Sequence, residues 1–242
     1  MLICCVLVPA AAGLAHRGTR EPLAGDADAP PLRPPVYTAV VNQIPDMLQT
    51  DPHARLPDGG KAYCGPVAVS NSLVWLDAVG FPDMVPDVRS PSAAQADLAR
   101  LLGSAGYMNT DPTAGTGPAG VLLGVQRYVR ERLYQYERLE YQGWRPHPAE
   151  FRTGVAVPEL SFMQEGILGA GAVWVNIGWY TYDRRRDEYR RVGGHWVTMV
   201  GYGEDEEGRP HPHIIIVHDP APRAGVHPAH EYVLLRQIQS GT

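Results

Sequence analysis

The sequence predicts an α+β fold, with helices in the first half of one domain and an antiparallel sheet in the second. Two observations carry this prediction. Between residues 65 and 136 the apolar residues recur at the three- and four-residue spacing of helices, whereas residues 172–218 contain short β-rich runs separated by polar turns. Helices followed by strands, instead of alternating with them, indicate an α+β domain.

Individual elements follow from the same periodicity and from turn residues. Helices are expected at residues 65–79, 93–102, 118–136 and 159–168, and strands at 36–41, 172–179, 195–202 and 213–218. Pro66 suits the first turn of the first helix, and Gly80 with Pro82 ends it. The glycine-containing segment 115–120 could cradle an anion, but it lacks the Lys-Ser/Thr ending of a phosphate loop. We expect it to be the start of a helix, with Thr113 or Thr116 as the N-cap.

Three segments are expected along the 242 residues. Residues 1–15 combine an apolar run with small residues at its end, as a secretory signal does, although no positive charge precedes the run. Residues 16–35 are rich in Pro, Ala and Arg, which is typical of a linker. Residues 36–242 can bury one core. We therefore expect a periplasmic or extracellular protein, or a cytoplasmic one if the first segment is not a signal.

Composition narrows the expected partners. The net charge is −5, and no basic block is longer than the run of three arginines at 184–186, which argues against nucleic acid. No apolar run reaches the roughly 20 residues that span a bilayer. The expected partner is a peptide or protein substrate, and the chain is expected to be a monomer without cofactor.

Histidines near the C-terminus raise the alternative of a metal site. They are His211, His213, His218, His227 and His230. No cysteine and no carboxylate at a fitting spacing accompany them, and Pro212 interrupts the strand, so no metal is expected. The aromatic residues Trp174, Trp179, Tyr180 and Tyr182 are interpreted as sheet packing, with a cleft lined by Trp179 and Trp196 as the alternative.

Cys64 is the strongest candidate for chemistry. It is the only cysteine outside residues 1–15, and it opens a predicted helix in the sequence Tyr63-Cys64-Gly65-Pro66. If residues 1–15 are removed, it has no partner for an intramolecular disulfide. A helix N-terminus favours a thiolate, so a nucleophile is one interpretation. A buried inert thiol and an intermolecular bridge are the others.

A predicted hairpin supplies a base for that thiol. The strand that begins at His195 is followed by an acidic turn, and a second strand then leads to Asp219. If the hairpin is centred near Glu207, Tyr202 faces Pro212 and His195 faces Asp219. Opposed residues have Cβ atoms roughly 5 Å apart, so the carboxylate could orient the imidazole. A thiol, a histidine and an aspartate are the groups of acyl-transfer catalysis.

These motifs resemble those of the C39-like branch of the papain-like cysteine peptidases. The resemblance rests on Tyr63-Cys64-Gly65-Pro66-Val67-Ala68, Gly194-His195-Trp196-Val197 and Asp219-Pro220, in that order. It implies a papain-like fold, and a peptidase with Cys64 as nucleophile, His195 as base and Asp219 as the residue that orients it. It also implies a Gln that donates to the oxyanion together with the Cys64 N–H. Gln49 is that residue, with Gln43 as the alternative, although residues 50–63 form a longer insert than is usual.

Two other functions use the same residue types. One is a Cys-dependent acyltransferase, such as a transglutaminase-like enzyme. The other is a papain-like domain that has lost catalysis and serves for binding. The resemblance implies no particular substrate.

Overall fold

The computed structural model describes residues 2–9, 37–40, 44–86, 90–204, 207–221 and 231–234. The helices of these ranges are α1 (Cys64–Val79), α2 (Pro91–Gly103), α3 (Pro118–Glu131) and α4 (Leu160–Leu168). The strands are β1 (Leu2–Pro9), β2 (Tyr37–Val40), β3 (Tyr136–Gln142), β4 (Ala172–Asp183), β5 (Glu188–Glu204), β6 (Pro210–His218) and β7 (Glu231–Leu234). The α+β class is therefore confirmed.

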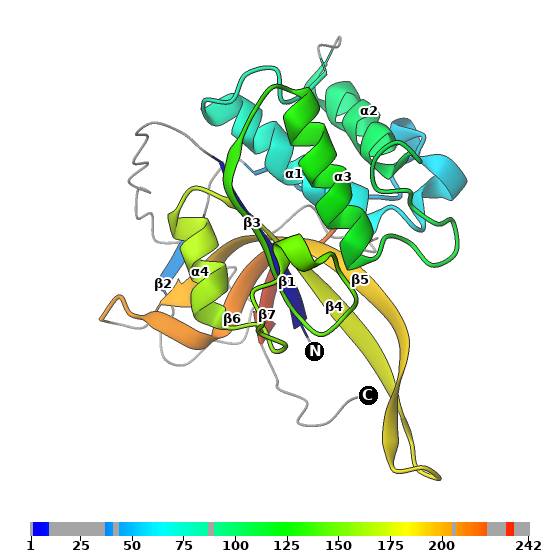
Figure 1. The fold of residues 1–242 in the computed structure, drawn as a ribbon, viewed down its shortest axis with the longest axis vertical. Coiled ribbons are helices and arrows are strands. Elements are labelled where there is room, and N and C mark those ends of the chain that lie inside the picture. The colour runs from blue at the N-terminus through cyan, green and yellow to red at the C-terminus, as the bar shows by residue number, and fades with distance from the viewer. Residues whose placement is uncertain are drawn as a thin grey trace, which may run out of the picture.

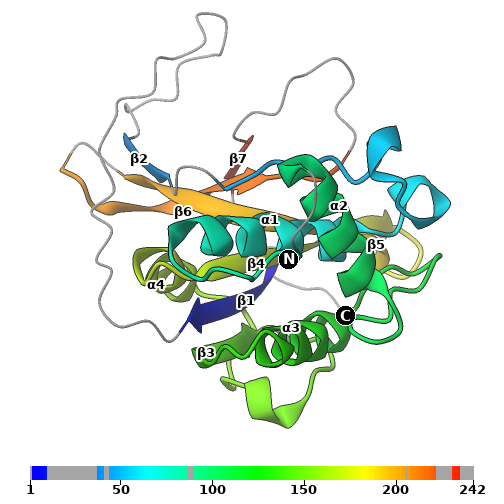
Figure 2. The same cartoon turned by 90° about the horizontal axis from the view of Figure 1, so that it is seen from above.

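All strands of the described residues belong to one antiparallel sheet. Its order is β3-β1-β4-β5-β6-β7, and β2 pairs with β5 beside this path. Figure 2 shows β3 near one edge and β2 and β7 towards the other. Helices α1, α2 and α3 gather at one end of the molecule, while the tip of the β4–β5 hairpin projects away from it (Figure 1).

The central strands bury both faces, which explains their nearly continuous apolar runs. Side chains alternate between two hydrophobic cores, as the period of two requires. One core packs against α1, α2 and α3, and receives from the sheet Trp174, Trp196, Val200 and Ile216. The other packs against α4, and receives Val173, Val175, Val197, Met199, Tyr202, Ile215 and Val217. The sheet is therefore the middle of three layers.

Helix α1 is buried along most of its length, and it carries polar side chains into the core. Asn71 is fully buried and bonded at both ends of its amide. Its Oδ1 accepts from the Met47 N–H (3.3 Å) and from Gln95 Nε2 (2.6 Å), and its Nδ2 donates to Thr198 Oγ1 (3.3 Å). Thr198 in turn donates to the carbonyl of Ala68 at 2.8 Å. Buried polar groups are stable only when they are bonded in this way. The network fixes α1 against β5, the strand that carries His195.

Several predicted elements differ from the observed ones. The third helix ends at Glu131 instead of 136, because Leu133 adopts a left-handed conformation (φ 63°), and the chain continues as β3. The N-cap of α3 is Gly117, not a threonine. Strands β4 and β5 extend through the polar residues 180–194 as one hairpin. Trp179 is 54% exposed on this hairpin, so only part of the aromatic series packs in the sheet.

The N-terminal segment has a place in the sheet. Residues of β1 pair with β3 on one side and with β4 on the other, for example Cys5 with Tyr141 and with Trp174. Removal of residues 1–15 would take a strand from between two others. The exported location stays a prediction, and this pairing argues against cleavage at residue 15. The predicted linker 16–35 lies outside the described residues. In the described part of the chain no helix has the length and apolarity to cross a membrane.

Candidate active site

Cys64 is the first residue of α1, and the neighbouring packing leaves little room around it. Its side chain is 8% exposed. A Cβ at Gly65 would lie 3.2 Å from Thr116 Cβ and 3.3 Å from Trp196 Cδ1, so glycine lets α1 begin close against β5 and the segment before α3. Trp196 donates from Nε1 to the carbonyl of Thr116 at 2.8 Å and holds that segment in place. The helix start is thus wedged beside the strand that bears His195.

The carboxylate of Asp219 reaches His195 as expected, but not through the predicted register. Nε2 of His195 lies 2.5 Å from Oδ1 of Asp219, and the side chains are 11% and 23% exposed. In the hairpin, however, Tyr202 pairs with Ile215 instead of Pro212, because irregularities fall between 199 and 201 and between 202 and 204. The last pair is Thr198–His218, so Asp219 follows the end of β6 and reaches diagonally to the ring. Its Oδ1 also accepts from the N–H of Ala221 (2.7 Å).

The imidazole of His195 interacts with both Asp219 and Cys64. Burial lowers the pKa of His195, but hydrogen bonds to Asp219 and Cys64, and the charges of both, outweigh burial and raise the pKa from 6.5 to about 9. Since Nε2 faces Asp219, Nδ1 is the ring nitrogen left for the thiol. An imidazole with this pKa holds its proton at neutral pH, and a protonated imidazole beside the sulfur stabilises a thiolate. The three side chains are therefore brought together.

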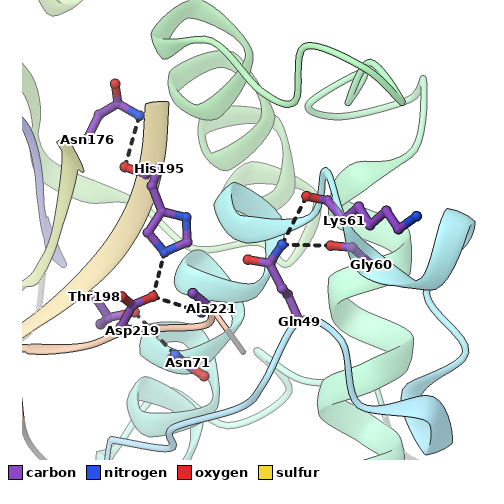
Figure 3. Close-up of polar contacts among 9 residues, drawn as sticks. All are labelled: Gln49, Gly60, Lys61, Asn71, Asn176, His195, Thr198, Asp219 and Ala221. Atoms are coloured by element: carbon purple, nitrogen blue, oxygen red, sulfur yellow. Dashed lines mark hydrogen bonds and ion pairs between the residues drawn. The ribbon is translucent and has the colours of Figure 1, made fainter. Parts of the chain in front are cut away.

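Asn176 on β4 steadies the backbone at His195. Its Nδ2 donates to the carbonyl of His195 at 3.2 Å, and its Oδ1 accepts from Nη1 of Arg145 at 3.4 Å (Figure 3 draws the first of these bonds). Asn176 is 2% exposed, so both of its polar ends are satisfied away from solvent. The strand therefore presents the histidine ring from a fixed backbone.

Gln49 lies at the site, but its amide is engaged elsewhere. Its Nε2 donates to the carbonyls of Gly60 (2.8 Å) and Lys61 (3.0 Å), and its backbone N–H donates to the carbonyl of Pro220 (2.9 Å). Its Oε1 is buried and finds no hydrogen-bond partner in the described part of the chain, and Figure 3 draws this atom on the side of Gln49 that faces His195. In this arrangement both amide hydrogens hold the insert 50–63 instead of pointing to the site. Gln43 lies outside the described residues.

The other candidates can be placed in part. Of the five C-terminal histidines, His218 alone has a described side chain; it is 6% exposed and its Nδ1 lies 3.1 Å from the carbonyl oxygen of Pro45. Among the described residues no group of three His, Cys, Asp or Glu side chains could hold a metal ion. Trp196 is 1% exposed and belongs to the core, so it does not line a cleft with Trp179.

Sequence reasoning missed the residues that support the three central ones. Asn71 and Asn176 interrupt apolar runs, and a polar amide in such a run is the signal that could have marked them as buried and bonded. Arg145 lies between predicted elements and carries no such signal. Comparisons with protein-family models, with curated proteins and with solved structures gave no match to this chain.

Proposed function

We propose that the chain is a papain-like cysteine peptidase of the C39-like kind, a thiol hydrolase that cleaves peptide or isopeptide bonds. One observation carries the proposal: the ring of His195 is hydrogen-bonded to Asp219, and Cys64 at a helix start lies near enough to raise the pKa of that ring. This is the order of nucleophile, base and orienting group that acyl-transfer chemistry needs. The antiparallel sheet that carries His195, packed against a helix that begins at Cys64, is also the layout expected of a papain-like fold.

In the proposed reaction the sulfur of Cys64 attacks the carbonyl carbon of the substrate. A C–S bond forms, and the electrons of the C=O double bond move to oxygen. When this intermediate collapses, the C–N bond breaks and His195 gives its proton to the departing amine. Water then gives a proton to His195 and adds its oxygen to the acyl carbon, and the C–S bond breaks. The products are an amine and a carboxylate, and the thiolate–imidazolium pair is restored.

The developing oxyanion needs donors, and the backbone N–H of Cys64 at the start of α1 is one. Gln49 is the proposed second donor. For that role its carboxamide must give up a carbonyl of Gly60 or Lys61 and turn an N–H towards the site. The unpartnered Oε1 supports such a turn, because it makes no hydrogen bond that the turn would have to break. The carboxamide of Gln49 makes this turn when the substrate binds.

The test is covalent labelling followed by hydrolysis. A thiol-reactive peptide probe should modify Cys64, as located by peptide mass mapping, and the Cys64→Ala variant should not be labelled. On a broad peptide panel the same variant should lose hydrolysis by roughly a thousandfold or more. Full hydrolysis by Cys64→Ala would overturn the mechanism. A matched control is Ser70→Ala, which removes one heteroatom from α1 away from His195 and should keep most activity.

Two alternatives are separated by the same assay. An acyltransferase would pass the acyl group to an added primary amine more readily than to water, and the amide product would dominate over the acid. A binding domain without catalysis would leave peptides intact and show ordinary thiol reactivity. The proximity of Cys64 to His195, which raises the pKa of the imidazole, supports the catalytic interpretations over this last one.

A further inference from the structure

A β-bulge at Val192 changes the face on which Arg191 lies. On β4 and β5, Trp179 pairs with Gly193 whereas Tyr180 pairs with Arg191, so Val192 is the extra residue. A bulge reverses the alternation of side chains and re-aims the next one. Arg191 therefore shares a face with position 194, and a Cβ at Gly194 would overlap Nη2 of Arg191. The guanidinium covers the glycine that directly precedes His195.

Two glycines form the floor beneath this guanidinium. Gly178 pairs with Gly194 across β4 and β5, so neither strand presents a side chain there. Tyr180 leans over one of them, with its Cε2 2.7 Å from where a Cβ of Gly178 would be. Tyr180 and Arg191 therefore cover the two glycines, on the face of the sheet that also carries Trp196, whose ring packs against the start of α1.

A second guanidinium lies near this pair of glycines. Nη1 of Arg145 bonds to Asn176 Oδ1, and Asn176 lies two residues before Gly178 on β4, hence on the same face. Nη2 of Arg145 lies 3.9 Å from where a Cβ of Gly117 would be, and the adjacent Thr116 packs against Gly65. Arg145 is thus linked to the start of α1 through Gly117 and Thr116, and to the backbone of His195 through Asn176.

The two arginines repel each other, and neither is paired with a carboxylate in the part of the chain that the structure describes. Burial lowers the pKa of Arg145, and the charge of Arg191 lowers it further, so the two cations are near enough to interact. Within the described residues neither guanidinium forms an ion pair with a carboxylate. Elsewhere in that part of the chain arginines such as Arg138 and Arg186 do so. Two close, half-buried guanidinium groups without a carboxylate partner can bind an anionic group of a ligand.

We propose that Arg145 and Arg191 form a subsite for a carboxylate of the substrate, beside the bond attacked by Cys64. The inference rests on the proposed function and names its substrate class: peptides that carry a carboxylate within about one residue of the scissile bond. That carboxylate is an acidic side chain or a free C-terminus, which present the same group. Guanidinium forks bind it with paired hydrogen bonds, and Tyr180 covers the apolar part beside it.

The first test uses small alkylating agents and requires no hydrolysis. Iodoacetate and iodoacetamide both transfer a two-carbon group to the thiolate with loss of iodide, and they differ in that one carries a carboxylate. The rate ratio of iodoacetate to iodoacetamide at Cys64 reports the subsite. We expect this ratio to fall roughly tenfold in Arg145→Gln and in Arg191→Gln, and further in the double variant. Arg145→Lys keeps the charge but not the fork, and should give an intermediate ratio.

Arg190→Gln is the matched control. Arg190 precedes Arg191 on β5, is exposed, and pairs with Thr181, so it lies on the opposite face. The Arg190→Gln substitution removes one positive charge at the neighbouring position of the strand. It should leave the ratio of the two alkylation rates at Cys64 close to that of the wild type. An equal fall in Arg190→Gln would indicate a long-range field and overturn the subsite. So would an unchanged ratio in the double variant, provided that its thermal unfolding matches that of wild type.

A second test measures binding to the Cys64→Ala variant, so that its result does not depend on catalysis. Three peptides of one length are compared by calorimetry: one with an internal Glu and an amidated end, one with Gln and a free C-terminus, and one with Gln and an amidated end. Tighter binding of the first or second by roughly tenfold identifies the source of the carboxylate, and Arg191→Gln in the same background should abolish the difference. Equal binding of all three peptides overturns the proposal. Failure of the proposed function would look different: Cys64 would react slowly with both alkylating agents.

Discussion

Gly60 makes two contacts with Gln49, one with its side chain and one with its backbone. Its carbonyl accepts the side-chain amide of Gln49 at 2.8 Å, and its Cα lies so close to the backbone carbonyl of Gln49 that a Cβ there would overlap it. The backbone of Gly60 is also left-handed (φ 79°), which glycine adopts without strain. The insert 50–63 is therefore fastened to Gln49 at Gly60 and the adjacent Lys61, just before Cys64.

Gly60→Ala should loosen this attachment. The substitution adds left-handed strain of about 1–2 kcal/mol and also displaces the Gln49 carbonyl, so we expect a loss of about 3 kcal/mol or more in the free energy of unfolding. Gly59→Ala is the control, because Gly59 has the same handedness (φ 66°) and nothing within 4 Å of its Cβ position. It should lose only the strain, about 1 kcal/mol. Equal losses in denaturant titrations would show that the contact with Gln49 carries no stability.

Asp219→Asn should slow the thiol. The amide keeps a hydrogen bond to the ring but removes the negative charge, so the pKa of His195 should fall towards 6.5 and the imidazolium at neutral pH should become less populated. We expect hydrolysis to drop roughly 100-fold and the alkylation rate of Cys64 to fall with it. Asp183→Asn, on the β4–β5 hairpin, makes the same chemical change and should have little effect. An unaltered pH profile of alkylation in Asp219→Asn would contradict the orienting role.

Stability should depend on pH through the same pair. The pKa of His195 is about 9 in the folded protein, above the value of 6.5 expected when the chain is unfolded, so folding favours the protonated ring. This contribution to stability is complete below pH 6.5 and is lost as the pH rises through about 9. The difference in free energy of unfolding between wild type and Asp219→Asn should therefore be larger at about pH 6 than at about pH 10. A difference that grows with pH would refute the assignment.

Deletion of residues 1–15 should damage the sheet. The deletion removes β1 and its pairing with both β3 and β4. We expect the shortened chain to unfold at a clearly lower temperature or to lose its cooperative transition. Removal of residues 20–30 shortens the chain by a similar length within the predicted linker and should be tolerated. Unfolding of the 16–242 chain at the temperature of the full chain would restore the interpretation of these residues as a signal.

The parts of the site that the sequence predicts are those with local signals. A cysteine before a proline-led helix, and a histidine and an aspartate at the two ends of a hairpin, can be recognised one segment at a time. The register of the hairpin cannot be recognised in this way. The irregularities after Met199 and Tyr202 depend on tertiary packing, and no residue type in the sequence indicates them. Likewise the polar residues 180–194 look like turns, since both faces of that hairpin are largely exposed and lack the alternation of a half-buried strand.

Residues that act through distant partners are the ones that sequence reasoning misses. Arg145, which lies between secondary-structure elements, is placed by Asn176 on β4. Asn71 is placed by a helix and a strand 24 and 127 residues away. Helix α3 illustrates the opposite error: Leu133 continues the apolar pattern of the helix, yet it lies 92% exposed in a left-handed turn. Local propensity favoured a longer helix there, and the pairing of β3 with β1 prevailed.

The strand order has a consequence for the order of events during synthesis. Strand β1, made first, completes its pairing with β4 only after residue 177 has been added, and His195 and Asp219 follow later still. Contacts so far apart along the chain form slowly and late. Helix α1 can form long before residue 195 has been made, so the nascent chain carries Cys64 without the imidazole that would activate it under the proposed function. Under that proposal, the newly made protein stays inactive until the C-terminal strands have joined the sheet.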